Sequence, residues 1–557
     1  MIKHWLMWGL FAVLSVAALI SSLGTAFQTL PLNPDMAEMA LIYQGIVHHG
    51  WRFPFTWRFN QDNQFLSLLP FALIFYALVG VSGASIVIQG WLIFVVNAML
   101  SGLVVKTVTR SWMWGYLAWL IALLAGPMAI GQPGILAYPV SHNAVWMFGL
   151  IGIIALLRYI IDKPRWAFPT MLVCVFTGTV SDPWFQAAYT LPIIFLLWKA
   201  PALFSRDKSD FRIAIKWIVA AYVVGRITYF IFADFNIFSQ QSISFASPSI
   251  MLKHLILLTK GIGTYLCLYP LPTNFISLVV WFIFIFSVLV VFCFAIIYRK
   301  LLPASFIIVI LFAFYSSALM SILFVVTNFA TGGWAIEYLI NIFYLFILSL
   351  LAIAYVFESM NFSARIFTRA SVIAYLVLSM TLIVNGDFRF SPNWGETKKV
   401  VYFLVKNHLY FGYGSYFGAQ SPLFALASDG AITGRHIGSN MGLPIIQMGN
   451  GDKGFWYSDP SKETTPQFII FSKADSELIS ITKKYIGPPN RVIYFLNYTI
   501  FIYDRNLLPH LLANRWLSNN RWRQMNIERN VKGINKVCRS LNINPLPIEH
   551  AYIEFAH

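Results

Sequence analysis

Long apolar runs separated by short polar segments dominate the first 386 residues of the chain. A helix needs about twenty residues to cross the roughly 30 Å hydrocarbon core of a membrane, so runs near this length predict about eleven transmembrane helices. We place them at 5–24, 84–105, 113–131, 143–161, 166–181, 183–198, 214–232, 275–298, 304–327, 338–357 and 369–386. The pattern therefore predicts a polytopic all-α membrane domain over residues 1–386.

Lysine and arginine residues set the expected orientation of these helices. With the N-terminus in the cytoplasm, fifteen of them before residue 387 fall in inner loops and four in outer loops, which agrees with the positive-inside rule. This balance holds only if the apolar stretch 66–81, which Pro70 interrupts, is not a span. We expect this stretch to be an interfacial helix within a long first external loop, at about 25–84.

The character of the chain changes after residue 386. Residues 387–510 combine turn-forming residues with short β-type runs at 468–471, 492–495 and 498–503, which predicts a soluble α/β domain. The odd number of spans places this domain on the external, or periplasmic, face. A basic tail, 511–557, follows, and its interleaved Trp516 and Trp522 favour a membrane surface over nucleic acid as its partner.

The composition excludes a soluble globular enzyme. Apolar residues make up 58% of the 557 positions and charged residues only 11%, and the formal net charge is +17. Ordinary soluble domains carry about 25% charged residues. The chain therefore has too few polar groups to cover a surface that faces water, and we expect a multi-pass membrane protein in contact with lipid.

An acid pair follows the first predicted span. Asn33 and Pro34 are typical of a helix start, which would place Asp35 and Glu38 three residues apart on one face of the helix. Acids in a first turn also complement the helix dipole, which is a purely structural role. Two carboxylates beside a cavity between helices can alternatively act as a general base or hold a cation.

The same external loop carries basic and polar residues further along, including Arg52, Arg58 and Asp62. Arginine forms charge-assisted hydrogen bonds with phosphate, and these bonds strengthen where water is scarce. Arginine and tryptophan are also ordinary interfacial anchors that need no ligand. Both interpretations stay open for this segment.

Other chemical groups lie near the outer ends of later spans. Asp182 precedes Pro183, so it can cap the next helix or face the cavity. An arginine inside a span is a functional candidate, although its side chain can also reach the interface. Arg226 is such an arginine and is a candidate for binding the donor phosphate. Three further residues are candidates for the same role: His142, Lys253 and His254.

The stretches 34–40 and 45–54 carry a resemblance to a known family. They are similar to the pattern of bacterial lipid A aminoarabinose transferases and protein mannosyltransferases, which belong to the GT-C superfamily of membrane glycosyltransferases. In those proteins an Asp-Glu pair precedes a helix, a Gly-aromatic turn and a proline. This chain differs in separating Asp35 from Glu38, and in having Asp62-Asn63-Gln64 where several relatives have Lys-Pro.

The resemblance implies a GT-C-like fold in a bacterial inner membrane and transfer of a hexosyl or pentosyl group on its outer face. The donor would be a polyprenyl-phosphate sugar, and the acceptor a hydroxyl of a glycan, lipid or protein. Asp35 would be the base, and Glu38, Asp62 and Asp182 would position the acceptor or a divalent cation such as Mg²⁺ or Mn²⁺. Six residues would lie near the donor phosphate: Arg52, Arg58, His142, Arg226, Lys253 and His254.

Two other functions fit the same topology. A ligase or polymerase of lipid-linked glycans would share most of this chemistry. A lipid or solute transporter would show internal repeats and charges spread through the membrane, whereas here the acids gather at the outer ends of the spans and no repeat is evident.

Overall fold

The computed structural model divides the chain into two compact units, Met1–Asn393 and Trp394–His557. The residues that it describes are 2–60, 62–204, 208–235, 237–238, 244–266, 302–328, 333–360, 369–370, 372–378, 390–440, 442–446, 451–452, 466–511 and 513–514, with single positions among 278–297 and at 366. Each unit is described by itself below. The basic tail expected at 511–557 lies almost entirely outside the described residues.

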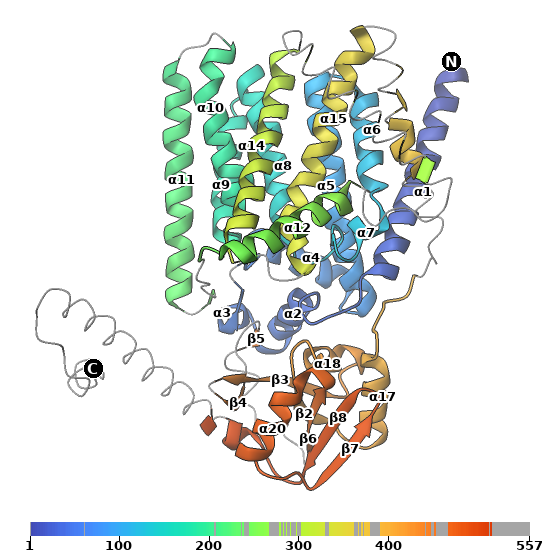
Figure 1. The fold of residues 1–557 in the computed structure, drawn as a ribbon, viewed down its shortest axis with the longest axis vertical. Coiled ribbons are helices and arrows are strands. Elements are labelled where there is room, and N and C mark those ends of the chain that lie inside the picture. Colours follow the sequence, from blue (N-terminus) through green and yellow to red (C-terminus); the bar gives the residue numbers. More distant parts are fainter. Residues whose placement is uncertain are drawn as a thin grey trace, which may run out of the picture. The chain divides into compact units, whose positions relative to one another are not determined.

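The first unit is helical (Figure 1). Its helices α5, α6, α8 to α11, α14 and α15 run side by side in Figure 1. The elements in chain order are α1 (Ile2–Thr29), α2 (Glu38–His49), α3 (Phe53–Thr56), the short strand β1 (Trp57–Arg58), α4 (Leu69–Val79), α5 (Gly83–Thr109), α6 (Trp112–Leu123), α7 (Pro127–Ile130), α8 (His142–Ile161), α9 (Ala167–Ser181), the π-helix η1 (Gln186–Thr190), α10 (Leu191–Phe204), α11 (Lys208–Asp234), α12 (Pro248–Tyr265), α14 (Ala304–Val326), the 3₁₀-helix η3 (Gly333–Leu339) and α15 (Ile340–Met360).

Among the described residues, six helices are long and apolar enough to cross a membrane. They match six of the eleven expected spans in position: Phe11–Thr29, Gly83–Thr109, His142–Ile161, Ser209–Asp234, Ala304–Val326 and Ala335–Glu358. The expected spans at 275–298 and 369–386 lie largely outside the described residues. The polytopic helical fold class is confirmed, whereas the predicted number of eleven transmembrane spans is not.

Three expected spans are shorter or interrupted. The span expected at 113–131 ends as α6 at Leu123, and Gly126 and Pro127 then begin the separate helix α7, because a proline cannot continue the preceding helix. The span expected at 166–181 is α9, with 15 residues. The span expected at 183–198 is the π-helix η1, which leads directly into α10.

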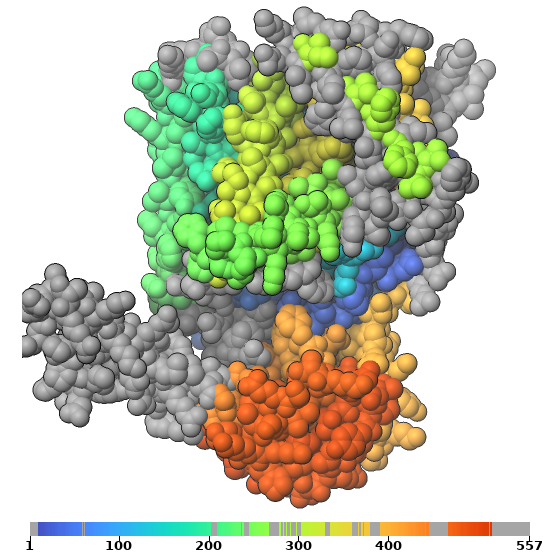
Figure 2. Space-filling model, viewed as in Figure 1, coloured from blue at the N-terminus to red at the C-terminus, as the bar shows by residue number. Residues whose placement is uncertain are grey.

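Two helices lie in segments expected to be external. The apolar stretch 66–81 forms the 11-residue helix α4, as expected for a stretch too short to span. The stretch 233–273, between the expected spans 214–232 and 275–298, contains the 18-residue helix α12. Figure 1 shows α12 crosswise to α14 and α15, and Figure 2 shows it on the surface of this unit. Four of its six buried residues repeat at helical spacing: His254, Leu258, Gly261 and Tyr265.

Local sequence signals explain the packing of α5 against α6. Ser82 caps α5, because its hydroxyl accepts the backbone N–H of Ser85 at 3.1 Å. A Cβ atom at Gly102 would lie 2.6 Å from the carbonyl oxygen of Gly115, and the reverse distance would be 2.8 Å. These two glycines therefore allow a close approach of the two helix backbones.

The second unit contains a six-stranded sheet in the order β4-β3-β2-β6-β8-β7, in which β2 runs parallel to β3 and β6 and the other pairs are antiparallel. Its elements are α17 (Thr397–Lys406), β2 (Phe411–Gly414), η4 (Ser421–Leu423), α18 (Phe424–Ala427), β3 (Thr433–Asn440), β4 (Leu443–Ile446), β5 (Gly451–Asp452), β6 (Gln467–Ser472), η6 (Lys473–Asp475), α20 (Ser476–Tyr485), β7 (Arg491–Phe495) and β8 (Tyr498–Tyr503). Strands β6, β7 and β8 confirm the three runs that the sequence predicts.

Alternation along β6 builds a core on each face of this sheet. Phe468 and Ile470 pack in the cluster that contains α17 and α18 side chains, while Ile469 and Phe471 pack in the cluster that contains Leu478 of α20. Side chains of a strand point alternately to opposite faces, so these residues can be buried on both. The second unit is therefore an α/β domain with helices on both faces of its sheet.

Candidate functional site

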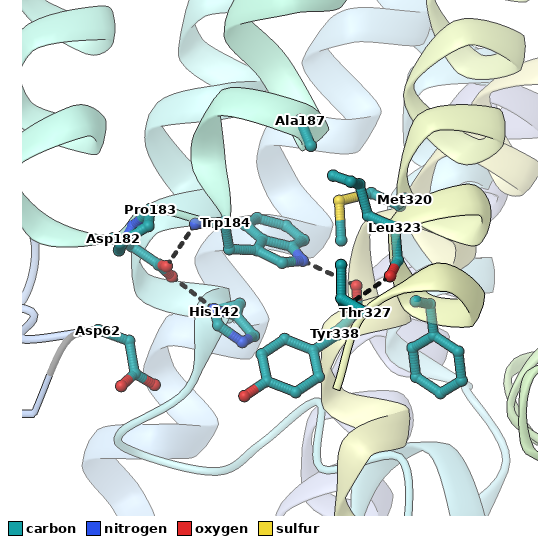
Figure 3. Close-up of a pocket in the computed structure, with 11 residues that line it drawn as sticks. Asp62, His142, Asp182, Pro183, Trp184, Ala187, Met320, Leu323, Thr327 and Tyr338 are labelled. Atoms are coloured by element: carbon teal, nitrogen blue, oxygen red, sulfur yellow. Dashed lines mark hydrogen bonds and ion pairs between the residues drawn. The ribbon is translucent and has the colours of Figure 1, made fainter. Parts of the chain in front are cut away.

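A cavity lies among elements of the first unit (Figure 3). Its wall consists of Asp62, His142, Asp182, Pro183, Trp184, Ala187, Met320, Leu323, Phe324, Thr327 and Tyr338. Asp62, His142 and Asp182 make one part of this wall polar. Another part is apolar, because α14 contributes Met320, Leu323 and Phe324 at the spacing of one helix face. The cavity therefore suits a ligand with a polar group next to a hydrocarbon chain.

His142 is held on several sides within this cavity. Ser141 caps α8 and so places His142 at the first helical position. The His142 Nδ1 atom lies 2.5 Å from Asp182 Oδ2, and the ring stacks on Trp184 with 4.8 Å between centroids and 17° between planes. Tyr338 lies on the ring as well, with 4.9 Å between centroids. These contacts fix the position and orientation of the imidazole.

The other ring nitrogen of His142 has a different environment. His142 is only 1% exposed, and its Nε2 atom has no hydrogen-bond partner within the part of the chain that the structure describes. Figure 3 shows this nitrogen on the side of the ring away from Asp182. Buried polar atoms normally have partners, so the unpartnered Nε2 atom is an unusual feature of this histidine.

Asp182 combines the two roles that the sequence left open. Its Oδ1 atom accepts the backbone N–H of Trp184 at 2.9 Å, which caps the turn after α9, and its Oδ2 atom pairs with His142. Its side chain is 1% exposed. A carboxylate with both oxygens engaged by the protein is well placed to hold the imidazole.

Acidic residues from distant parts of the sequence gather around this histidine. Asp62 and Glu337 both interact electrostatically with His142, and Asp62 also interacts with Asp182. Burial raises the pKa of Asp62 to about 6, and the charge of Asp182 acts in the same direction. Asp234, at the end of α11, is exposed.

The acid pair after the first helix is arranged differently from the expectation. Helix α2 begins only at Glu38, so Asp35 lies in the preceding turn, where Asn33 Oδ1 accepts the backbone N–H of Met36 at 3.0 Å. The expected helix start is therefore four residues too early. Asp35 is half-buried and is not among the residues that line the cavity.

Glu38 is a buried carboxyl group, only 4% exposed, and accepts a hydrogen bond from Trp57 Nε1 at 3.0 Å. Burial raises the pKa of Glu38 from 4.5 to about 8, and the charges of Asp35 and Asp62 add to this effect, while the Trp57 hydrogen bond opposes it. Glu38 therefore keeps its proton at neutral pH. Asp35 and Asp62 act on Glu38 electrostatically, so the acid pair lies near the acids of the cavity.

Of the expected phosphate-binding residues whose side chains the structure describes, only His142 lines the cavity. Arg226 is half-buried in α11 with its guanidinium over the rings of Tyr229 and Phe230, at 4.9 Å and 4.7 Å. His254 is buried and its Nδ1 atom donates to a backbone carbonyl, that of Val325, at 3.2 Å.

The remaining basic candidates are exposed or undescribed. Arg52 and Lys253 are exposed, at the start of α3 and on α12 respectively. The side chain of Arg58 lies outside what the structure describes.

The carboxylates do not form a metal site in the described part of the chain. No three His, Cys, Asp or Glu side chains among the described residues are grouped closely enough to hold a metal ion. Mg²⁺ is commonly held by only one or two carboxylates together with substrate phosphates and water. The expected divalent cation therefore stays a prediction.

No protein-family model and no curated protein matches the chain. A comparison with solved structures finds a crystal structure of ArnT from Cupriavidus metallidurans in the apo state. The chain is similar in fold to ArnT. The match covers 90% of this chain and 98% of ArnT, with 11% sequence identity and a TM-score of 0.49.

Several lining residues escape sequence reasoning. Tyr338 packs on His142, and its backbone carbonyl accepts the Trp184 Nε1 hydrogen bond at 2.7 Å. The sequence feature that could have pointed to this segment is the neighbouring Glu337, an acidic residue at the start of an apolar run. The α14 residues carry no such signal, because an apolar face that lines a cavity has the same pattern as one that faces lipid.

Proposed function

We propose that the protein is a membrane glycosyltransferase that moves a hexosyl or pentosyl group from a polyprenyl-phosphate donor to a hydroxyl group. The acceptor is a glycan, a lipid or a protein. One observation carries this proposal: a cavity whose polar wall, with His142 and Asp62, adjoins the apolar face of α14. A lipid-linked sugar has the same division between a polar head and a hydrocarbon chain.

The proposed reaction needs a carboxylate that takes a proton from the acceptor hydroxyl. The acceptor oxygen forms a bond to the anomeric carbon, and the bond from that carbon to the phosphate oxygen breaks with its electron pair on the phosphate. Asp35 is the proposed base. Glu38 is a poor choice at neutral pH, because its pKa of about 8 leaves it mostly protonated.

Asp62 is proposed to position the acceptor hydroxyl, because it lines the cavity and interacts electrostatically with both Asp35 and His142. Its carboxyl is half-buried, so part of it can reach a ligand in the cavity. No step of the proposed reaction is routed through a metal ion. In this proposal the reaction takes place on the external face of a bacterial inner membrane, with the N-terminus in the cytoplasm.

Asp35→Asn tests the proposal, because it keeps the shape of the side chain and removes its ability to take a proton. We expect cells that carry this variant to lose the sugar from their surface glycans, as measured by mass spectrometry against cells with and without the gene. Asp234→Asn is the matched control, since Asp234 is an exposed acid at the end of α11.

Normal glycans with Asp35→Asn would remove Asp35 from the role of base. A glycan profile that does not depend on the gene, together with altered uptake of a solute, would overturn sugar transfer and favour a transporter. A change in glycan chain length rather than in a single sugar would favour a ligase or polymerase.

A further inference from the structure

Helix α17 lies beside β7, the last strand of the sheet in the second unit (Figure 1). The rings of Phe403 on α17 and Phe495 on β7 stack, with 4.1 Å between centroids and 16° between planes. A groove lies at this contact, and among the described residues six line it: Lys398, Lys399, Tyr402, Phe403, Lys406 and Phe495. We call these six residues the α17 groove.

The α17 groove is positively charged. It contains three lysines and no acid, and the side chains of all three lysines are exposed. In the part of the chain that the structure describes, none of these lysines forms an ion pair with a carboxylate. A concave surface lined by charges of one sign concentrates ligands of the opposite sign. The α17 groove therefore favours an anionic partner.

An exposed ring adds a second kind of contact to the groove. Tyr402 is 72% exposed, and it lies three residues after Lys399 and four before Lys406, so these three side chains share one side of α17. The apolar residues Val400 and Leu404 of the same helix are buried in the core of the domain. A flat ring between two lysines suits a sugar unit that carries an anion, because the ring packs on the sugar and the lysines pair with its charge.

Other anionic partners fit the groove less well. Basic segments that bind a membrane surface commonly have about four to eight clustered lysines and arginines, whereas the α17 groove has three. A peptide that adds a strand to a sheet contacts the edge strand along its length, whereas Phe495 is the only residue of β7 among the described residues that line the groove. The observations therefore favour a glycan over a membrane or a peptide.

We propose that the α17 groove binds an anionic glycan chain, and that this chain is the acceptor of the transferred sugar. The acceptor role rests on the proposed function, which leaves a glycan, a lipid or a protein as the acceptor, whereas the binding itself does not depend on it. Contacts with units of a polymer away from the reacting hydroxyl raise the effective concentration of that hydroxyl at the enzyme.

Octagalacturonate tests the binding, because methyl esterification of its carboxylates removes the charge and keeps the sugar chain. Fluorescence anisotropy follows the binding of labelled octagalacturonate to the full-length protein in a non-ionic detergent. Unlabelled competitors are octagalacturonate, its methyl ester, a glutamate peptide of the same charge and vesicles of anionic phospholipid. We expect octagalacturonate to compete about 10-fold better than its methyl ester, and this preference should weaken as salt is added.

Two matched pairs of lysine substitutions separate the groove from the overall charge of the domain. Lys399→Gln/Lys406→Gln should weaken octagalacturonate binding about 3- to 10-fold, since each exposed ion pair contributes modestly. Lys483→Gln/Lys484→Gln removes the same charge from exposed positions of α20, which packs on the opposite face of the sheet, and should leave binding unchanged.

Two tyrosine substitutions test the contact with the sugar ring. Tyr402→Ala should weaken binding of octagalacturonate and of its methyl ester by the same factor, because the ring packs on the sugar whatever its charge. Tyr494→Ala is the control, since this ring is 78% exposed and its neighbour Phe495 faces α17, so Tyr494 points to the other face of the sheet. It should weaken neither ligand.

The outcomes decide the binding first. The inference is overturned if octagalacturonate and its methyl ester compete equally, or if Lys399→Gln/Lys406→Gln binds octagalacturonate as the wild type does. Competition by the glutamate peptide or by the vesicles as strong as that of octagalacturonate would also overturn it, in favour of an acidic peptide or a membrane.

Mass spectrometry of surface glycans then tests the acceptor role. Cells that carry Lys399→Gln/Lys406→Gln should have less of the transferred sugar than cells that carry Lys483→Gln/Lys484→Gln. Weakened binding together with normal glycans would overturn the acceptor role. The proposed function stands or fails separately, with the glycans of cells that carry Asp35→Asn.

Discussion

The buried carboxyl group of Glu38 makes the stability of the protein depend on pH in a predictable direction. Its pKa is raised from 4.5 to about 8 because the side chain is 4% exposed and lies near other acids. The folded protein therefore keeps a proton between these pH values that the unfolded chain releases. Stability falls as pH rises wherever the folded state binds more protons. Glu38→Gln has no proton to release and removes this contribution.

The size of the effect follows from the shift. A pKa difference of one corresponds to about 1.4 kcal/mol, and the pKa of Glu38 rises from 4.5 to about 8 on folding. Between pH 4.5 and pH 8 the wild-type protein should lose on the order of 4 kcal/mol of stability that Glu38→Gln retains. The glutamine oxygen can still accept the hydrogen bond from Trp57 Nε1, so that contact survives the substitution.

Thermal unfolding in detergent at pH 5, 6, 7 and 8 measures this difference. We expect the two proteins to have similar midpoints at pH 5 and the midpoint of Glu38→Gln to rise increasingly above that of the wild type towards pH 8. Glu477→Gln, at an exposed glutamate of α20, should show no such growing difference. A gap between Glu38→Gln and the wild type that does not change with pH would refute the reasoning.

Two further substitutions test the packing and the cavity. Gly102→Leu should lower the thermal unfolding midpoint by an amount equivalent to about 1–3 kcal/mol, because its Cβ would lie 2.6 Å from the Gly115 carbonyl oxygen. Gly9→Leu, where a Cβ would meet no atom within 4 Å, should leave the midpoint unchanged. Leu323→Trp should fill the apolar wall of the cavity and raise the KM for a polyprenyl-phosphate donor several-fold in a transfer assay. Ile322→Trp, at the adjacent residue that is 57% exposed, should not change it.

The sequence predicts the fold class because the physical signals for it are local. Apolar runs of sufficient length mark the helices, and short runs of aromatic and β-branched residues mark β6 and β8. Run length alone fails at 113–131, where Gly126 and Pro127 divide an apolar run into two helices. It also overlooks α12, because that helix has the buried spacing of an amphipathic helix and too few apolar residues for a span.

The candidate site is only partly predictable, because it depends on contacts between distant segments. The scarcity of acids in an apolar chain draws attention to Asp62 and Asp182, and both line the cavity. Asp182 pairs with His142, which is forty positions away in the chain, and no sequence spacing predicts this contact. Tyr338 lies further still along the chain. An aromatic residue at the end of a span gives the same sequence pattern whether it anchors the helix at the membrane interface or packs on a histidine.

The same distinction separates the basic residues that the sequence offers as candidates for a phosphate. By charge alone, Arg52, Lys253 and His142 are equal candidates in the sequence. The structure leaves the first two exposed and encloses the third beside a cavity, with Asp182 on one nitrogen and no partner among the described residues on the other. An exposed cation is screened by water and salt, whereas an enclosed one interacts strongly with a ligand that shares its cavity. Enclosure, which the sequence does not encode locally, therefore carries more weight than the number of positive charges in the external segments.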